Sequence, residues 1–276
     1  MDQGRSDSTN STRGTGGGTT GRRSDGLYER LGQPHLRPAW ELLQRIKLQR
    51  GERVLDFPCG HGEISCWIAG VVGEQGTVHA ADISRAALEA TRQSLDQIGR
   101  QDAQVVQANP AAMDRLGSFD VVFCHAAGPV VEDLQRFLQG IRVNLRPGGR
   151  FALQIPAPGW CPDFVETVDD CLEHDSKGFY AHHFLEPSTQ ELTEALKTQG
   201  FRESDVSGKL FIERFDTLGD AVAHFELTAL PALLRELPPD ARAPFLETFR
   251  RRLAERFRRT HDLEIVFRRA FAYGRR

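Results

Sequence analysis

Short apolar runs alternate with longer amphipathic segments along most of this chain. The run at 119–124, FDVVFC, is almost continuously apolar, as expected of a parallel strand that is covered on both faces. The longer segments carry apolar residues at the three- and four-residue spacing of a helix, as in PAWELLQRIK at 38–47. Strands that alternate with helices at this pitch predict an α/β fold with a mostly parallel sheet and helices on both faces.

The same pattern predicts the individual elements. Strands are expected at Arg53–Phe57, Thr77–Ala81, Gln104–Ala108, Phe119–Cys124, Arg150–Ile155, Lys209–Phe215 and Ile265–Tyr273. Helices are expected at Pro38–Lys47, Glu63–Val72, Arg85–Ile98, Leu134–Leu145 and 189–199, and at about 219–230 and 241–257. Ser84 and Ser188 suit helix N-caps, Gly51 and Gly200 suit helix ends, and Pro147 should stop the helix before it.

Composition separates a tail from a folded domain. Residues 1–26 are mostly Gly, Ser, Thr, Arg and Asp, and such a segment buries too little apolar surface to fold, so we expect disorder there. Residues 27–276 should form one domain, with 157–184 and 219–257 as lid or substrate elements. Trp160, Phe164, Phe179 and Tyr180 are candidates for the apolar wall of that lid.

Charge and cysteine content exclude several classes of protein. A net charge of -3 argues against a protein that coats nucleic acid, and no apolar run is long enough to span a membrane. The arginines at 250–259 surround an apolar stripe and are expected to be a solvated helix face. The five cysteines form no CxxC pair, which predicts reduced thiols, no zinc site and a cytoplasmic protein.

The candidate chemistry is concentrated in VLDFPCGHG at 54–62. An apolar strand leads into Asp56 and then into a tight turn with Gly60 and Gly62, where backbone N–H groups can approach a ligand at a helix start. Twenty residues after Gly62, a second apolar run ends in Asp82, at the place where an acid binds a ribose diol. These features predict a cofactor that carries a nucleoside.

The acids favour one such cofactor. Asp56 would repel the pyrophosphate of a dinucleotide, and Ser65 replaces the third glycine of the dinucleotide fingerprint. No G-x-x-x-x-G-K-[ST] loop for a nucleoside triphosphate occurs. S-adenosylmethionine has an ammonium group, a ribose diol and no phosphate, and therefore matches two acids around a glycine turn.

In these motifs the chain resembles the class I S-adenosylmethionine-dependent methyltransferases, over about residues 28–276. The resemblance lies in VLDFPCGHG (54–62), VHAADIS (78–84), QANPAAMD (107–114), FDVVFCHAAGPVVED (119–133) and LRPGGRFALQIP (145–156). HLRPAWELLQRI (35–46) and EIVFRRAFAYGRR (264–276) make it most similar to the trans-aconitate and malonyl-carrier-protein methyltransferases. It implies a Rossmann-like, doubly wound, seven-stranded sheet with an antiparallel C-terminal strand and a helical lid.

The resemblance also implies roles for single residues. Gly60, His61 and Gly62 would line the methionine part of the cofactor, and Asp56 would bind its amino group. Asp82 would bind both ribose hydroxyls, and Ile83 would pack on the adenine. Asn109 would accept from the adenine amino group. His125 would lie beside the transferred methyl, and Tyr28 would close over the cofactor.

The acceptor is left open. The implied reaction is an in-line displacement that transfers the methyl group to a small molecule, and His125 is the first candidate for a general base. Arg268 and Arg269 alternate on a predicted strand, so one should face inward and could bind an acidic substrate. Pro58 and His61 depart from the family's turn, which keeps a non-catalytic or regulatory protein as an alternative, beside a protein or RNA methyltransferase. The oligomeric state is not predicted.

Overall fold

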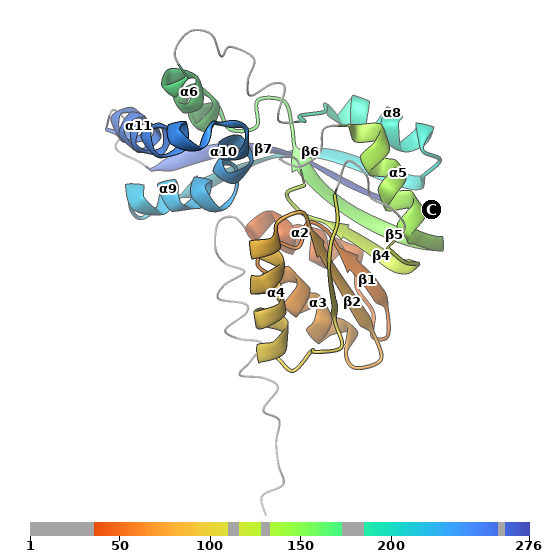
Figure 1. Cartoon of the computed structure of the whole chain (residues 1–276). Coiled ribbons are helices and arrows are strands. Elements are labelled where there is room, and N and C mark those ends of the chain that lie inside the picture. The colour runs from red at the N-terminus through yellow and green to blue at the C-terminus, as the bar shows by residue number, and fades with distance from the viewer. Residues whose placement is uncertain (1–35, 110–115, 128–132, 173–184, 259–262) are drawn as a thin grey trace, which may run out of the picture.

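A seven-stranded sheet organises the chain (Figure 1). The computed structural model describes residues 36–109, 116–127, 133–172, 185–258 and 263–276. Its strands are β1 (Arg53–Asp56), β2 (Thr77–Asp82), β3 (Gln104–Gln107), β4 (Phe119–Cys124), β5 (Leu145–Pro156), β6 (Arg202–Arg214) and β7 (Glu264–Arg275). Their order across the sheet is β3-β2-β1-β4-β5-β7-β6, and β7 runs antiparallel to both of its neighbours. The predicted fold class is therefore confirmed, including the antiparallel C-terminal strand.

Helices cover both faces of the sheet (Figure 1). One face carries α2 (Arg37–Ile46), α3 (Glu63–Val72) and α4 (Arg85–Gln97), and the other carries α5 (Leu134–Asn144) and α8 (Thr189–Thr198). The predicted caps of two helices are confirmed, because Ser84 accepts from the N–H of Ala87 and Ser188 forms a capping box with Glu191.

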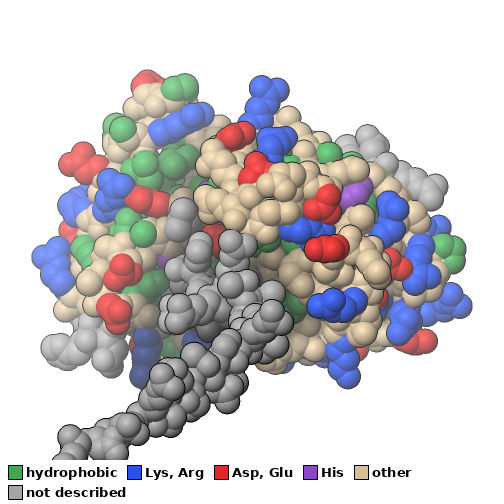
Figure 2. Space-filling view, turned by 90° about the horizontal axis from the view of Figure 1, so that it is seen from below, with side chains coloured by type: hydrophobic (Ala, Val, Ile, Leu, Met, Phe, Trp, Pro, Cys, Tyr) green, Lys and Arg blue, Asp and Glu red, His purple; other side chains and the backbone are tan. Residues whose placement is uncertain are grey.

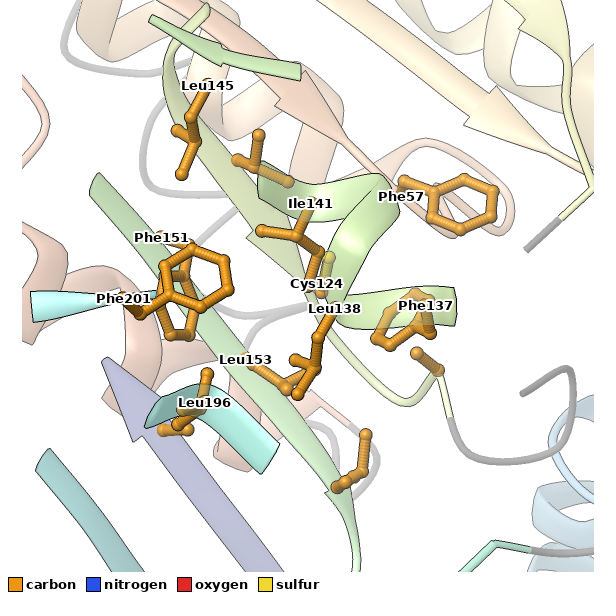
Figure 3. Close-up of a cluster of buried hydrophobic side chains, with 14 of the residues drawn as sticks. Phe57, Cys124, Phe137, Leu138, Ile141, Leu145, Phe151, Leu153, Leu196 and Phe201 are labelled. Atoms are coloured by element: carbon orange, nitrogen blue, oxygen red, sulfur yellow. The ribbon is translucent and has the colours of Figure 1, made fainter. Parts of the chain in front are cut away.

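A continuous apolar core lies between the sheet and α5 and α8. Figure 3 shows Phe151 and Leu153 of β5 facing Leu138 and Ile141 of α5. The side chain of Phe57, just after β1, belongs to the same cluster and is fully buried near Phe137. Because successive side chains of a strand point to opposite faces, Ala152, between Phe151 and Leu153, packs instead in the cluster that contains α2.

Four further helices form a cap at one end of β7, on the left in Figure 1. They are α6 (Pro162–Cys171), α9 (Leu218–Leu227), α10 (Leu230–Glu236) and α11 (Pro239–Phe257). Phe164 of α6, Phe225 of α9 and Phe249 of α11 pack together in its core. Trp160 and Phe164 are both buried in this cluster, and their place in the apolar wall of a substrate lid stays a prediction. Phe179 and Tyr180 lie outside the described residues.

The predicted apolar stripe of α11 is confirmed, and its basic face is paired with acids. Phe245, Phe249, Leu253 and Phe257 are buried. Arg250 pairs with Glu226, and Arg256 pairs with Glu166 and Asp170. Ion pairs of this kind match the expected solvated helix face.

Some predicted boundaries are wrong. Lys47, in the left-handed region at φ 50°, ends α2, whereas Gly51 forms the later turn into β1. The strand β5 already begins at Leu145, and its pairing with β4 is irregular across the segment that contains Pro147. The helices α6 and α10 were not predicted: α6 lies in the segment 157–184 that was assigned to a lid, and α10 begins where the predicted helix at about 219–230 was expected to end.

Candidate active site

Asp56 is a buried acid at the C-terminal end of β1, where β2 and β4 flank it. Its side chain is 1% exposed, and one carboxylate oxygen accepts a hydrogen bond from the hydroxyl of Ser65 at 2.5 Å. Burial, together with the smaller effect of the nearby charges of Asp82 and Glu63, raises the pKa of Asp56 to about 7. The hydrogen bond from Ser65 opposes this rise, and no Lys or Arg of the described residues pairs with the carboxylate.

The turn after Asp56 is tightly constrained at its second glycine. Gly62 has a φ of +90° and is the N-cap of α3, and a Cβ atom there would lie 2.9 Å from the Cα of Thr91. Gly60 also has a positive φ, +55°, but a Cβ atom on it would meet nothing within 4 Å. The glycine at 62 is therefore required by the packing of α4, whereas the backbone at 60 faces open space.

Thr91 of α4 fastens this turn. Its hydroxyl donates to the carbonyl oxygen of Gly60 at 2.9 Å and lies 3.5 Å from the thiol of Cys59. The N–H of Cys59 donates to the carbonyl of Ala81, which joins the turn to β2. Burial raises the pKa of the Cys59 thiol, so this thiol stays protonated. Sequence analysis missed Thr91, although a polar residue on the apolar stripe of a helix was a visible signal.

Asp82 is held at the end of β2 by two backbone groups. It is 6% exposed, and its two oxygens accept from the N–H of Gly60 at 3.1 Å and of Ser84 at 2.9 Å. A carboxylate has about four acceptor positions, so two remain for a further donor such as a hydroxyl. The structure thus brings Asp56, Asp82, Gly60 and Gly62 together, as the sequence predicted.

The other predicted site residues lie around this centre or outside the described chain. Ile83 is half-buried beside Asp82, and its carbonyl accepts from Gln107 at 3.0 Å. Asn109 and His61 are exposed, and His125 is half-buried directly after β4. Tyr28 lies outside the described residues.

These residues fit a ligand that carries a cation and a diol. Among the described residues, no Lys or Arg pairs with the buried carboxylate of Asp56, and none would meet a Cβ atom on Gly60. Asp82 offers two unused acceptor positions at the neighbouring strand end. The described residues contain no cluster of three His, Cys, Asp or Glu side chains that could hold a metal ion.

Comparison with known proteins gives the family. Residues 48–200 match the family described as "Methyltransferase domain". The chain belongs to this family. Together with the seven-stranded fold, this identifies a class I methyltransferase domain, a type of domain whose cofactor is S-adenosylmethionine. The match covers all the residues of β1, α3, β2 and α4 that build the site.

Curated relatives share part of the chain. It is 32% identical over 130 residues to a trans-aconitate 2-methyltransferase of Variovorax paradoxus. This alignment covers 47% of this chain and 48% of the relative. It is 33% identical over 149 residues to a ubiquinone/menaquinone biosynthesis C-methyltransferase of Klebsiella pneumoniae, covering 52% and 55%. The chain therefore spans about half the length of these relatives.

The structural similarity to solved proteins covers more of the chain than these sequence matches do. A phosphoethanolamine N-methyltransferase 2 of Haemonchus contortus, solved with S-adenosylhomocysteine, superposes with a TM-score of 0.55. The match covers 94% of this chain and 58% of that one at 15% identity, and so shows a shared fold. No helix in the described part of the chain has the length and apolar character needed to cross a membrane.

Proposed function

We propose that this methyltransferase transfers the methyl group of S-adenosylmethionine to a small-molecule acceptor. The observation that carries the proposal is Asp56, a buried carboxylate near Gly60 that has no cationic partner in the described part of the chain. A buried acid of this kind requires a positively charged group to be stable in its ionised form. The relatives named for trans-aconitate and for a quinone support a small acceptor.

In this proposal each site residue has a separate binding task. Asp56 binds the ammonium group, and Asp82 binds both ribose hydroxyls with its two remaining acceptor positions. The turn from Gly60 to Gly62 contacts the methionine part. Ile83 packs on the adenine, and Asn109 accepts from its amino group. Tyr28 closes over the bound cofactor.

In the proposed reaction the main task of the protein is to position the cofactor and the acceptor. The bound cofactor supplies an activated methyl group on a sulfonium, and the protein's residues hold acceptor and donor in line and exclude water. His125 follows β4, next to the strand that carries Asp56. It takes a proton from a hydroxyl, amine or acidic carbon if the acceptor has one, whereas a carboxylate acceptor needs no base. The helical cap and residues 157–184 form the acceptor side.

Two experiments test the proposal. Isothermal titration with S-adenosylmethionine and with S-adenosylhomocysteine should show binding of both; no binding of either would overturn the enzyme assignment. Transfer of a labelled methyl group into a metabolite extract, and not into protein or RNA, should then identify the acceptor class. Cofactor binding without transfer to any of the three would favour the regulatory alternative suggested by Pro58 and His61.

A further inference from the structure

Arg269 is a buried arginine in the middle of β7. Its side chain is 5% exposed, whereas its neighbour Arg268 is exposed and donates to the carbonyl of Gly159. The expectation that one of the two faces inward is thus confirmed. Arg269 pairs in register with Pro156 of β5 and Lys209 of β6, on the sheet face that also carries Phe211 and Phe267.

The guanidinium of Arg269 is buried beside two aromatic rings. In the described part of the chain its Nε has no hydrogen-bond partner, and no ion pair joins it to a carboxylate. The ring centroids of Phe267 and Phe211 lie 5.1 and 5.9 Å from the guanidinium carbon. A buried charge with unmet donors is costly, and buried arginines in proteins are normally paired. This arginine therefore has donors available for a bound anion.

The surrounding charges leave an excess of one positive charge. Glu213 of β6 is 1% exposed, and its charge acts on Arg269 from a distance. One oxygen of Glu213 lies 3.5 Å from Arg37 of α2, which is 58% exposed, and the other has no hydrogen-bond partner. Two arginines and one glutamate give a net positive charge, which suits a bound anion, and the planar guanidinium fork matches a planar carboxylate.

A second unmet donor connects Arg269 to the active site. Gln154 of β5 is fully buried, and its Oε1 accepts from the N–H of Ala126, in the segment after β4 that carries His125. Its Nε2 has no hydrogen-bond partner among the described residues. Gln154 pairs in register with Phe271, so Gln154 and Arg269 are diagonal neighbours on one sheet face, with Cα atoms about 7–8 Å apart.

We propose that Arg269 and Gln154 together bind a carboxylate group of the methyl acceptor. The guanidinium fork matches the two oxygens of a carboxylate, and the amide of Gln154 adds a donor on the side of the β4 segment. The assignment of this anion site to the methyl acceptor rests on the proposed function, whereas the existence of the anion site does not. The acceptor is then an organic acid whose carboxylate is bound beside the helical cap.

A binding experiment on the full chain, saturated with S-adenosylhomocysteine, tests the site. The probes are succinate and inorganic phosphate at constant ionic strength, measured by isothermal titration and by thermal melting. Succinate should bind the wild type and raise its melting temperature, and Arg269→Met should weaken this binding at least about tenfold, the effect of losing a charge-assisted hydrogen-bond pair. The matched control Arg268→Met, on the opposite face of the same strand, should bind succinate within about twofold of the wild type.

Several results would overturn the proposal. These are no succinate binding to the wild type, equal binding by Arg269→Met, or tighter binding of phosphate than of succinate. If Arg269→Met does not fold, Arg269→Lys keeps the charge beside Glu213 but loses the planar fork. That variant should bind S-adenosylhomocysteine like the wild type and succinate more weakly.

A second measurement separates this proposal from the proposed function. A metabolite extract is divided by anion exchange before labelled S-adenosylmethionine and the protein are added. Label should enter the retained, anionic fraction, and label only in the neutral fraction would overturn the carboxylate. Failure to bind S-adenosylmethionine would overturn the proposed function, while the succinate titration without cofactor would still decide whether the anion site exists.

Discussion

At the scale of single residues, Asp82 carries the most direct test of the proposed cofactor site. Its oxygens already accept from Gly60 and Ser84 and have two acceptor positions left. Replacing Asp82 with Ala removes both proposed bonds to the ribose and should weaken S-adenosylmethionine binding by about 100-fold, the loss expected from two hydrogen bonds to a charged group. Isothermal titration measures this. Unchanged affinity would contradict the site, and Asp102→Ala, at an exposed acid, is the matched control.

The protonation of Asp56 makes cofactor binding depend on pH. Its pKa is raised to about 7, so the apo protein holds this acid largely protonated at pH 6. An ammonium group binds the ionised form, so affinity for S-adenosylmethionine should rise from pH 6 to pH 8, with release of a proton below pH 7. Isothermal titration in buffers with different heats of ionisation measures the number of protons released on binding. Affinity that is flat with pH in the wild type would contradict the role of Asp56.

The same group makes the apo protein less stable at higher pH. The folded protein binds the proton of Asp56 more tightly than the unfolded chain does, so unfolding is easier as pH rises from about 4 to 7 and is not altered further above that. Asp56→Asn removes this loss and should stabilise the apo protein by up to about 4 kcal/mol at pH 8 and by almost nothing at pH 4. Urea unfolding at both pH values checks it, and equal effects at both would refute the raised pKa.

Some residues of the site can be predicted from the sequence, and others cannot. Asp56, Gly60, Gly62 and Asp82 were predicted because their type and spacing have a direct chemical meaning. Thr91 was not, because a polar residue on the apolar stripe of a helix does not by itself show what it contacts, and its role depends on the distance between α4 and the turn. Ser65 was noted only as a small residue, and its hydrogen bond to Asp56 appears only once α3 is placed beside β1.

At the scale of elements, the junction of the turn with α4 should discriminate between two glycines. An alanine at position 62 would need a positive φ and would place its Cβ atom 2.9 Å from the Cα of Thr91. An alanine at position 60 would need only the positive φ. We expect Gly60→Ala to lower the free energy of unfolding by about 1–2 kcal/mol and Gly62→Ala by clearly more. Chemical denaturation of the pair measures the difference. Equal losses would contradict the packing of Thr91 against Gly62.

The helical cap should be separable from the cofactor half. Phe249 is fully buried between Phe164 and Phe225, and its truncation to Ala should cost about 3–5 kcal/mol of stability. Because the cap is distant in sequence and packing from Asp56 and Asp82, cofactor affinity of the folded protein should change little while methyl transfer falls. Leu210→Ala, at a 56% exposed position, is the control. Loss of cofactor binding by folded Phe249→Ala would contradict this division.

The elements differ in how well the sequence predicted them, for a physical reason. The strands β1 to β4 and the helices between them follow simple periodicities, since each is covered on a fixed face. The first half of β6 was missed because it is exposed and polar, and its place is set by pairing with β7. The cap helices α6 and α10 depend on packing within the cap, through Phe164 of α6 and Leu230 and Leu233 of α10, which a local pattern does not contain.

At the scale of the whole molecule, the N-terminal tail is predicted to be separate from the folded domain. Its composition offers almost no apolar surface to bury, so deleting residues 1–26 should leave the free energy of unfolding within about 0.5 kcal/mol and leave cofactor affinity unchanged. Extending the deletion through residue 34 removes Tyr28 and should weaken S-adenosylmethionine binding, as should Tyr28→Ala in the full chain. Thermal melts and titrations of the three variants decide this: weaker binding after the shorter deletion would give the tail a role, and unchanged binding after the longer one would remove Tyr28 from the site.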